Sequence, residues 1–111
     1  MADLSLIVPV YNEEENLPLL HEAIVKALKP IGRTWELVFV DDGSKDGGRK
    51  VMMGLREKDP RVRVVGFSRN FGKSAALTAG FARARGGIVI TMDADLQDDP
   101  AEIPRFLEAI Q

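Results

Sequence analysis

The segment of the sequence that points most clearly to chemistry is Asp93-Ala94-Asp95-Leu96-Gln97, which follows an apolar run typical of a strand. In an extended chain, alternate side chains share a face, so Asp93, Asp95 and Gln97 are predicted to point to one place. Their oxygen atoms are the ligands that hard cations such as Mg²⁺ and Mn²⁺ take, usually with positions left open for substrate phosphates. The spacing therefore predicts a metal site, although an acidic turn of this kind also fits a simple helix cap.

Polar residues follow three earlier apolar runs as well. These segments are Pro9-Val10-Tyr11-Asn12-Glu13, Asp41-Asp42-Gly43-Ser44 and Arg69-Asn70-Phe71-Gly72-Lys73. An aromatic ring such as Tyr11 can stack on a base, and carboxylates such as Glu13 and Asp42 can accept hydrogen bonds from a base or from sugar hydroxyls. Lys73 stands at a predicted helix start, where backbone N–H groups and the helix dipole favour a diphosphate. Each segment alone also fits a plain role in packing, capping or turn formation.

The elements that position these segments alternate regularly along the chain. The apolar, β-branched runs predict strands at Leu4–Val10, Glu36–Val40, Val62–Phe67 and Ile88–Met92. The intervening segments predict helices at Asn16–Leu28, Gly48–Lys58 and Lys73–Arg85, and a fourth from about Ala101. Such alternation predicts an α/β fold with a mostly parallel sheet and helices on both faces. In these sheets ligands bind beyond the carboxyl ends of the strands, which is where all the polar segments lie.

The first predicted helix has the clearest helical pattern. Its apolar stripe consists of Leu17, Leu20, Ile24 and Leu28. Asn16 is predicted to be its N-cap, and Pro18 lies in its first turn. His21 lies within this helix and is predicted to be a surface or packing residue. The third helix is rich in alanine and glycine, which predicts close packing on the sheet.

Composition limits the classes of protein that the sequence can encode. The 111 residues fit one domain, and the net charge of −2 gives no basic excess for a nucleic-acid partner. The absence of cysteine excludes disulfides, thiolate metal ligands and a thiol nucleophile. The longest apolar stretch, near Leu4–Tyr11, is far shorter than the roughly 18 residues that a membrane span needs.

Basic residues are concentrated in the middle of the chain. Residues 43–85 carry eleven basic and three acidic side chains, whereas both flanking segments are acidic. Most of these basic residues are predicted to be solvated on helix faces: Lys45, Arg49, Lys50, Arg56, Lys58, Arg61 and Arg63. The alternative is that some of them face an anion or an anionic membrane.

Taken together and in this order, the four polar segments resemble the nucleotide-sugar half of family 2 glycosyltransferases. The resemblance covers essentially the whole chain and is strongest to dolichol-phosphate mannosyltransferases and bacterial polyprenyl-phosphate glycosyltransferases. It implies a Rossmann-like nucleotide-diphospho-sugar transferase fold of the glycosyltransferase A type. The implied reaction is a metal-dependent, inverting transfer of a hexose, of mannose or glucose type, from a GDP- or UDP-linked donor. The implied acceptor is a polyprenyl or dolichyl phosphate.

The resemblance also implies roles for individual residues. Pro9, Tyr11, Glu13, Val40 and Asp42 would line the nucleoside site. Asp93, Ala94 and Asp95 would meet the ribose, the diphosphate and a Mg²⁺ or Mn²⁺ ion, with Gln97 completing the metal ligands and Lys73 beside the diphosphate. Asp95 would be the catalytic residue. The acceptor phosphate is already ionised near neutral pH, so a strong general base is unnecessary.

The resemblance is confined to one half of such an enzyme. Residues 1–111 match the nucleotide-sugar-binding portion, and we expect the acceptor-binding half to lie beyond Gln111. We therefore expect a truncated sheet with an exposed edge, self-association, and no complete transfer by this chain alone. The predicted location is cytoplasmic, at the cytoplasmic face of the membrane as part of a longer protein. The sequence departs from the family pattern at residues 47–48 and 98–101, outside the implied ligand set.

Other classes of protein fit the sequence less well. A response-regulator receiver needs an acidic pair after the first strand, where this chain has Tyr11-Asn12. A dinucleotide oxidoreductase needs a glycine-rich turn at the same place, and none is present. Two alternatives stay open: a nucleotide-sugar-binding domain without activity, and a family 2 enzyme that acts on a saccharide acceptor in cell-wall or polysaccharide synthesis.

Overall fold

The computed structural model describes residues 2–96 and 99–110. Its strands are β1 (Leu4–Val10), β2 (Trp35–Asp41), β3 (Val62–Gly66) and β4 (Ile88–Thr91). Its α-helices are α1 (Leu17–Leu28), α2 (Gly48–Lys58), α3 (Lys73–Arg83) and α4 (Glu102–Ile110), and a short 3-10 helix, η1 (Lys29–Ile31), follows α1. The predicted alternation is confirmed, with boundaries shifted by one or two residues. The short helix η1, which contains Pro30, was not predicted.

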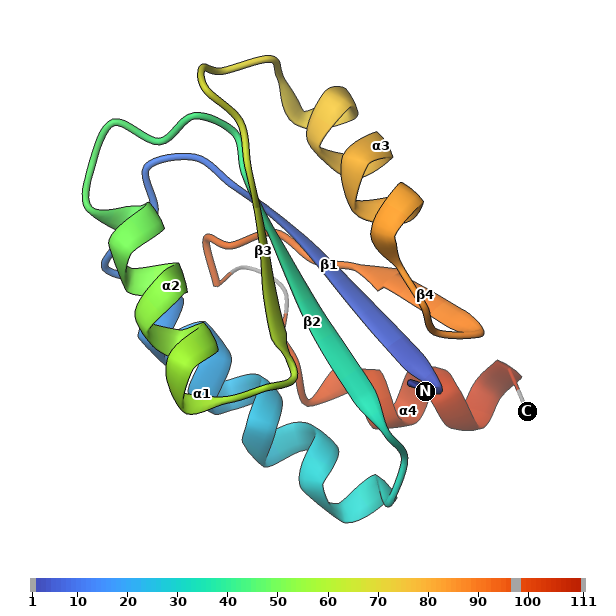
Figure 1. Ribbon diagram of the computed structural model, residues 1–111. Helices are drawn as coiled ribbons and strands as arrows, with labels where there is room; N and C mark the ends of the chain where they lie inside the picture. Colours follow the sequence, from blue (N-terminus) through green and yellow to red (C-terminus); the bar gives the residue numbers. More distant parts are fainter. Residues whose placement is uncertain (1, 97–98, 111) are drawn as a thin grey trace.

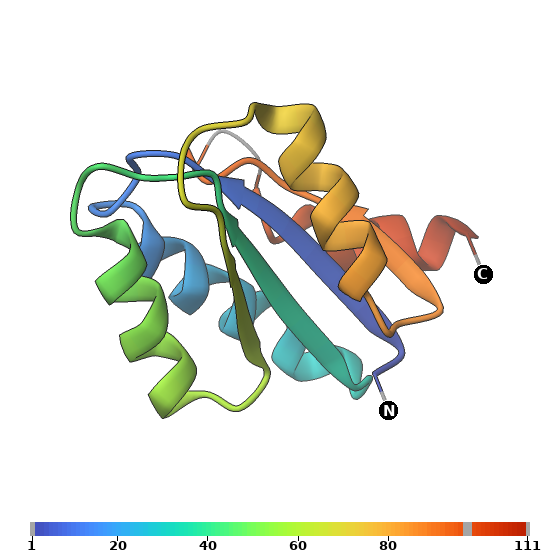
Figure 2. The same cartoon turned by 45° about the horizontal axis from the view of Figure 1, so that its top comes forward.

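The strands form a single four-stranded sheet in the order β3-β2-β1-β4, and every neighbouring pair is parallel. Helices α1, α2 and α4 cover one face and α3 covers the other (Figures 1 and 2). The predicted parallel sheet with helices on both faces is therefore confirmed. The chain moves outward from β1 to β3 and then returns to the other side of β1. A ligand is expected at this reversal, beyond the carboxyl ends of β1 and β4.

The core has one layer on each side of the sheet. On the α1 side, the predicted stripe of Leu17, Leu20, Ile24 and Leu28 is fully buried, which confirms it. On the α3 side, Ile7, Val38, Val40 and Ala76 form a smaller layer. A Cβ atom on Gly80 of α3 would lie 2.3 Å from a methyl carbon of Ile7. Only glycine fits there, which explains why a small-residue helix covers this face.

Asn16 occupies the N-cap position of α1, as predicted. Its side chain makes no capping hydrogen bond, however, and its backbone is already helical. Its Nδ2 instead donates to Oε2 of Glu13 at 2.7 Å. Asn16 therefore stabilises the turn before the helix rather than the first turn of the helix.

The predicted exposed sheet edge is present at β4, which among the described residues pairs only with β1. Val89 of β4 and Phe106 of α4 are among the exposed large apolar side chains, and both line a groove between these two elements. Self-association through this edge stays a prediction. Within the described residues, no helix combines the length and the apolar character needed to cross a membrane.

Candidate active site

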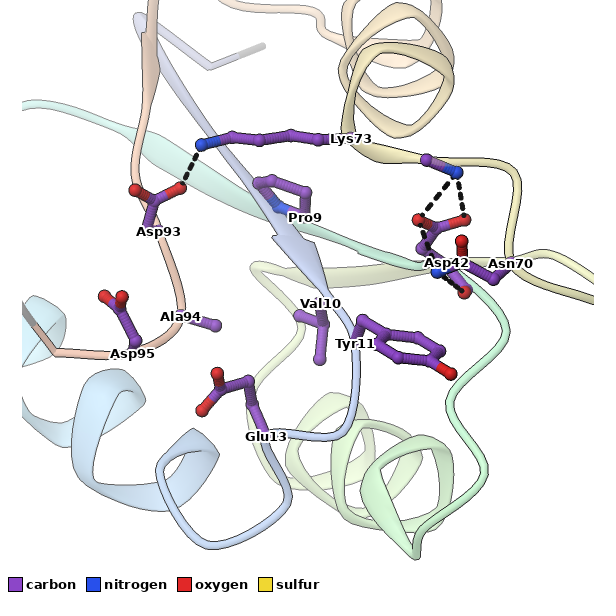
Figure 3. Close-up of a pocket in the computed structure, with 11 residues that line it drawn as sticks. Pro9, Val10, Tyr11, Glu13, Asp42, Asn70, Lys73, Asp93, Ala94 and Asp95 are labelled. Carbon is purple, nitrogen blue, oxygen red and sulfur yellow. Dashed lines mark hydrogen bonds and ion pairs between the residues drawn. The ribbon is translucent and has the colours of Figure 1, made fainter.

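An open cleft of about 460 Å³ lies at the carboxyl ends of β1, β2 and β4, beside the start of α3 (Figure 3). It is lined by Pro9, Val10, Tyr11, Glu13, Asp42, Asn70, Gly72, Lys73, Asp93, Ala94 and Asp95. Of the predicted site residues that the structure describes, all except Val40 lie here. Segments that are more than eighty residues apart in the sequence thus meet in one place because parallel strands end at the same edge of the sheet.

The acidic segment after β4 lies on one side of the cleft. The predicted extended conformation is wrong here, because β4 ends at Thr91, Ala94 and Asp95 form a turn, and Leu96 has a φ of +66°. Asp93 and Asp95 nevertheless both line the cleft, as predicted. Gln97 lies outside the described residues, so its predicted ligand role stays a prediction.

An ion pair crosses this side of the cleft. Nζ of Lys73, at the first position of α3, lies 2.7 Å from Oδ1 of Asp93 (Figure 3). The two side chains are 63% and 44% exposed, so both are accessible to a ligand that enters from solvent. The cleft therefore offers a cation for phosphate oxygens and carboxylates for a metal ion within the same few ångströms.

The carboxylates at this position suit a divalent metal in part. Asp93 and Asp95 supply the oxygen donors that Mg²⁺ and Mn²⁺ prefer. Among residues 2–96 and 99–110, however, no group of three His, Cys, Asp or Glu side chains is placed to hold a metal ion. Two carboxylates facing an open cleft fit a metal whose remaining ligands come from water and from substrate phosphates.

Asp42 lies on the opposite side of the cleft and is buried, with 4% of its surface exposed. Its Oδ1 accepts the backbone N–H of Phe71 at 2.7 Å, and its Oδ2 accepts the N–H of Gly72 at 3.0 Å and Nδ2 of Asn70 at 3.1 Å. Within the described residues, the loop between β3 and α3 thus supplies the hydrogen-bond donors to this carboxylate. The segment Arg69–Lys73 was predicted to lie at this edge of the sheet, with only Lys73 assigned a role; Asn70 and Gly72 line the cleft as well.

The nucleoside side of the predicted site also contains Tyr11 and Glu13. Tyr11 is 40% exposed, and Figure 3 shows its ring on the same side as Asp42 and away from Asp93 and Asp95. The next residue, Asn12, has a φ of +54° and ties this loop to the one after β2. Its N–H donates to Oγ of Ser44 at 3.0 Å, and its Oδ1 accepts the N–H of Lys45 at 2.8 Å. These bonds fix the backbone on either side of the exposed ring.

Val40 does not line the cleft. It is fully buried and packs in the core layer between the sheet and α3. The resemblance assigned it to the nucleoside site because it precedes Asp42 in the motif. Side chains alternate along a strand, and Val40 lies on the α3 face, so its prediction as a cleft residue is wrong. Val10, which was not predicted, lines the cleft in its place.

Asp41, the neighbour of Asp42, points away from the cleft lining and binds groups within the fold. It is fully buried, and it accepts the N–H of Ser44 at 2.9 Å and Nε of Arg49 at 2.7 Å. Arg49 also donates to the carbonyl oxygen of Phe67, so one guanidinium joins the ends of β2 and β3. Gly66 permits this, since a Cβ atom there would lie 2.7 Å from the guanidinium carbon. This contact holds the end of β2, immediately before Asp42, against the end of β3.

A family model described as glycosyl transferase family 2 matches residues 5–111 of the chain. The chain belongs to this family. The curated relatives include undecaprenyl-phosphate 4-deoxy-4-formamido-L-arabinose transferases. The one from Pectobacterium carotovorum is 44% identical over 110 residues, which are 97% of this chain and 33% of the relative. The one from Pseudomonas paraeruginosa is 46% identical over 106 residues, which are 95% of this chain and 31% of the relative.

The resemblance to polyprenyl-phosphate glycosyltransferases that the motifs predicted is thereby confirmed. The chain spans about a third of the length of these curated relatives.

Solved glycosyltransferase structures share the fold of the chain. A mannosyltransferase from Pyrobaculum calidifontis, in complex with GDP-Man and Mn²⁺, matches with a TM-score of 0.68 and 30% identity, over 85% of this chain and 28% of that one. Residues 1–349 of S. aureus TarS, in complex with UDP-GlcNAc, match with a TM-score of 0.76 and 25% identity, over 96% of this chain and 30% of that one. The predicted glycosyltransferase A fold is therefore confirmed.

Proposed function

We propose that this chain is the nucleotide-diphospho-sugar-binding part of a glycosyltransferase whose acceptor is a polyprenyl phosphate. The curated relatives, 41–46% identical, are named for transfer that involves undecaprenyl phosphate. The sequence predicted a hexose, whereas these relatives are named for an arabinose derivative. The proposal therefore specifies the class of donor, a sugar linked to GDP or UDP, and not one sugar.

The observation that carries the proposal is the arrangement of side chains around one cleft. Tyr11 and Asp42 lie toward one end, Lys73, Asp93 and Asp95 line the other, and Glu13 lies between them (Figure 3). Tyr11 offers an exposed aromatic ring, Asp42 and Glu13 offer acceptors for base or sugar hydroxyls, and Lys73, Asp93 and Asp95 offer charges for a diphosphate and its metal. A nucleoside diphosphate has this same division into an apolar, hydrogen-bonding part and an anionic part.

The proposed cofactor is Mg²⁺ or Mn²⁺, held by Asp93 and Asp95 with Gln97 as a further ligand. The similarity to a mannosyltransferase solved with Mn²⁺ supports a divalent ion. A bound ion would offset the negative charge that develops on the departing nucleoside diphosphate. Asp95 is the proposed catalytic residue because its exposed carboxylate lines the cleft on the same side as Asp93 (Figure 3).

The proposed acceptor requires no strong general base from this chain. A polyprenyl phosphate carries an oxygen that is already ionised near neutral pH, so the inverting attack on the sugar needs no strong general base. The chain's part is to bind the donor and orient it at the open side of the cleft. Such an acceptor is membrane-bound, which is why we place the longer protein at the cytoplasmic face of a membrane.

The test is a calorimetric titration of the chain with UDP and with GDP, in Mn²⁺ and separately in a chelator. We expect one nucleoside diphosphate to bind more tightly than the other, and binding to weaken strongly in the chelator. Adenosine diphosphate serves as a control for nonspecific binding of the diphosphate. Equal affinity for all three compounds, or none for any of them, would contradict the proposal.

A further inference from the structure

We propose that Asn12 is a positioning residue for the nucleoside end of the cleft, because it ties the loop that carries Tyr11 to the loop that follows Asp42. The inference deepens the proposed function, and its link to ligand binding rests on that function. Asn12 belongs to the polar segment after the first strand, but no role for it followed from the sequence.

The first argument is that two different loops build the nucleoside end. β1 and β2 pair in parallel as far as Val10 and Asp41, and the N–H of Asp42 donates to the carbonyl of Val10 at 2.8 Å. Tyr11 and Asp42 directly follow these strands, and from there the chain leads to different helices, α1 and α2. A base that stacks on the Tyr11 ring while its edge meets Asp42 needs both groups at a fixed separation.

The second argument is that Asn12 bonds the second loop with both its main chain and its side chain. Its N–H donates to Oγ of Ser44 at 3.0 Å, and its Oδ1 accepts the N–H of Lys45 at 2.8 Å and, more weakly, that of Asp46 at 3.4 Å. Ser44 is itself held, because its N–H donates to Oδ1 of the buried Asp41 at 2.9 Å. The first loop is therefore tied to a turn that the end of β2 holds in place.

A second pair of bonds joins the same loops two residues later. The N–H of Glu14 donates to Oδ2 of Asp46 at 3.2 Å, and Oε1 of Glu14 accepts the N–H of Gly47 at 3.2 Å. These bonds and the paired strands do not depend on the side chain of Asn12. Substitution of Asn12 should therefore loosen the segment at Tyr11 without unfolding the chain.

The third argument is the backbone conformation of Asn12. Its φ of +54° lies in the left-handed region, which asparagine tolerates better than most residues other than glycine. In the described part of the chain, the two non-glycine residues with positive φ are Asn12 and Leu96, and each directly follows a residue that lines the cleft. Backbone strain of this kind gathers at functional sites. Glycine would adopt this φ but would lack the acceptor that Oδ1 supplies.

These contacts let Asn12 act through its neighbour rather than on the ligand. Among residues 2–96 and 99–110, the cleft lining includes Tyr11 but not Asn12, which lines a separate hollow with Glu14 and Asp46. Tyr11 is 40% exposed, so packing alone does not hold its ring. The backbone that the Asn12 bonds fix therefore sets where the ring stands.

The anchor is tested first without any ligand, through the single tyrosine of the chain. With 3-fluorotyrosine incorporated, the chain gives one ¹⁹F resonance, from the Tyr11 ring. Asn12→Gly keeps the positive φ and removes the acceptor, so this resonance should move toward its position in the urea-unfolded chain. Amide exchange at Lys45 should accelerate about fivefold, the value of one ordinary hydrogen bond. An unchanged ¹⁹F resonance would overturn the proposal, whatever the exchange at Lys45.

A matched control comes from a similar bond at the opposite end of the sheet. Oγ1 of the exposed Thr34 accepts the N–H of Asp3 at 3.0 Å and so joins two segments of the chain. Thr34→Ala should leave the ¹⁹F resonance as it is in the parent chain. Ser44→Ala removes the other bond of Asn12 and should move the resonance in the same direction as Asn12→Gly, by a smaller amount. Equal movement in Thr34→Ala and Asn12→Gly would mean general loosening and would refute the anchor.

The second test separates positioning of the base from general damage to the cleft. The probes, all with Mn²⁺, are UDP or GDP, whichever binds the parent more tightly, the matching nucleoside, and inorganic pyrophosphate. Asn12→Gly should weaken the nucleoside diphosphate and the nucleoside by about two- to tenfold, the range for one ordinary hydrogen bond. Pyrophosphate affinity should not change, because the charges at the other end of the cleft keep their positions. Equal weakening of pyrophosphate would contradict a role confined to the nucleoside end.

A double substitution tests whether Asn12 acts through the ring. In a Tyr11→Ala background, Asn12→Gly should add little to the loss of nucleoside affinity, because both changes remove the same contribution. If the two losses add in full, Asn12 acts independently of Tyr11 and the positioning role is wrong.

The tests also separate failure of this inference from failure of the proposed function. If the parent chain binds no nucleoside diphosphate, the proposed function is wrong, and the ¹⁹F measurement still decides whether Asn12 fixes the Tyr11 ring. If the parent binds UDP or GDP but Asn12→Gly alters neither the ¹⁹F resonance nor nucleoside affinity, only the positioning role is wrong.

Discussion

The two ends of the sheet both carry clusters of charged residues, and they differ in how the charges are neutralised. At the carboxyl ends of the strands, the ion pair between Lys73 and Asp93 lies in an open cleft. At the amino ends, the carboxylates of Glu36 and Asp59 are buried and bonded to side chains and N–H groups of the fold, with 6% of each residue exposed. Charge density alone therefore does not mark the functional end. The difference is whether a ligand can reach the charges.

The Glu36 cluster joins four parts of the chain at the amino end. Its carboxylate accepts Oγ–H of Ser5 on β1, Nη1 of Arg63 on β3 and the N–H of Arg85 before β4. Burial would raise the pKa of Glu36, but these hydrogen bonds, with the charge of Arg63, outweigh burial and lower it. Oγ of Ser5 in turn accepts the N–H of Gly86. The cluster fixes the crossovers into the sheet and has no contact with the cleft.

Asp59 forms a second internal cluster at the same end. It accepts hydrogen bonds from His21 of α1 at 2.9 Å and from Nε and Nη2 of Arg61 at 2.9 and 3.0 Å. The guanidinium carbon of Arg61 lies 4.0 Å from the centroid of the Trp35 ring. Burial would raise the pKa of Asp59, but the hydrogen bonds from Arg61 and His21 lower it to about 2. His21 is thus a packing residue, as predicted, and it joins α1 to the turn before β3.

The largest expected effect of a single change is at Glu36. Glu36→Gln leaves Arg63 without its buried counter-charge and should destabilise the fold by about 3 kcal/mol. Urea unfolding followed by circular dichroism measures the change, and Glu22→Gln, on the exposed face of α1, is the matched control. UDP or GDP affinity of the folded variant should be unchanged. A loss of affinity without a loss of stability would contradict the contrast between the two ends.

Asp95 is expected to show the opposite behaviour. Asp95→Ala should weaken binding of the preferred nucleoside diphosphate by at least about tenfold, or 1.4 kcal/mol, when Mn²⁺ is present. In a chelator the loss should be much smaller, because the carboxylate acts through the ion. Calorimetry in both conditions measures this, with Asp3→Ala, an exposed acid at the other end, as control. Equal losses in the two conditions would exclude a metal role for Asp95.

The stability of the fold should depend on pH through Asp59, at the amino ends of the strands. The pKa of Asp59 is about 2 in the folded chain, below its ordinary value of 3.8. A lowered carboxyl pKa stabilises the fold at pH values above the ordinary pKa, and this stabilisation is lost as pH falls from about 4 to 2. Asp59→Asn should therefore reduce the free energy of unfolding at pH 7 by about 1–2 kcal/mol. Between pH 4 and 2, the free energy of unfolding of the variant should also fall less steeply than that of the parent, as measured by urea unfolding at several pH values. The same dependence of unfolding free energy on pH in parent and variant would contradict the lowered pKa of Asp59.

Most of the fold was predictable because local patterns and the global arrangement agree. The stripe on α1 and the β-branched strands each fit only one type of element. The polar residues after the strands converge because parallel strands end at one edge, so the cleft followed from topology. Sequence could not show that the chain turns at Ala94-Asp95, since this depends on the positive φ of Leu96.

The roles of the basic residues were harder to predict for a related reason. Arg49, Arg61 and Arg63 were predicted to be solvated, yet each donates to a buried carboxylate. Asp41 and Glu36 lie on other elements than Arg49 and Arg63, eight and twenty-seven residues away in the sequence, whereas Asp59 and Arg61 share the turn between α2 and β3. Pairings of this kind depend on where strands and helices cross, and a single sequence does not give side-chain distances. The same limit hid the loop contacts of Asp42.

The smallest expected effect concerns competition at the open end of the sheet. The Lys73 ammonium lies beside Asp93, which is also a proposed metal ligand, so the lysine and the ion compete for one carboxylate. An exposed ion pair is worth about 1 kcal/mol or less. Lys73→Gln should therefore raise the affinity for Mn²⁺ alone by up to about fivefold, while it weakens pyrophosphate binding in the presence of Mn²⁺. Electron paramagnetic resonance of free Mn²⁺ measures the first effect, and Lys45→Gln, exposed on another loop, is the control. If Lys73→Gln lowers Mn²⁺ affinity in the absence of phosphate, Lys73 supports the metal site rather than competing with it, and the two charges on this side of the cleft act as one unit.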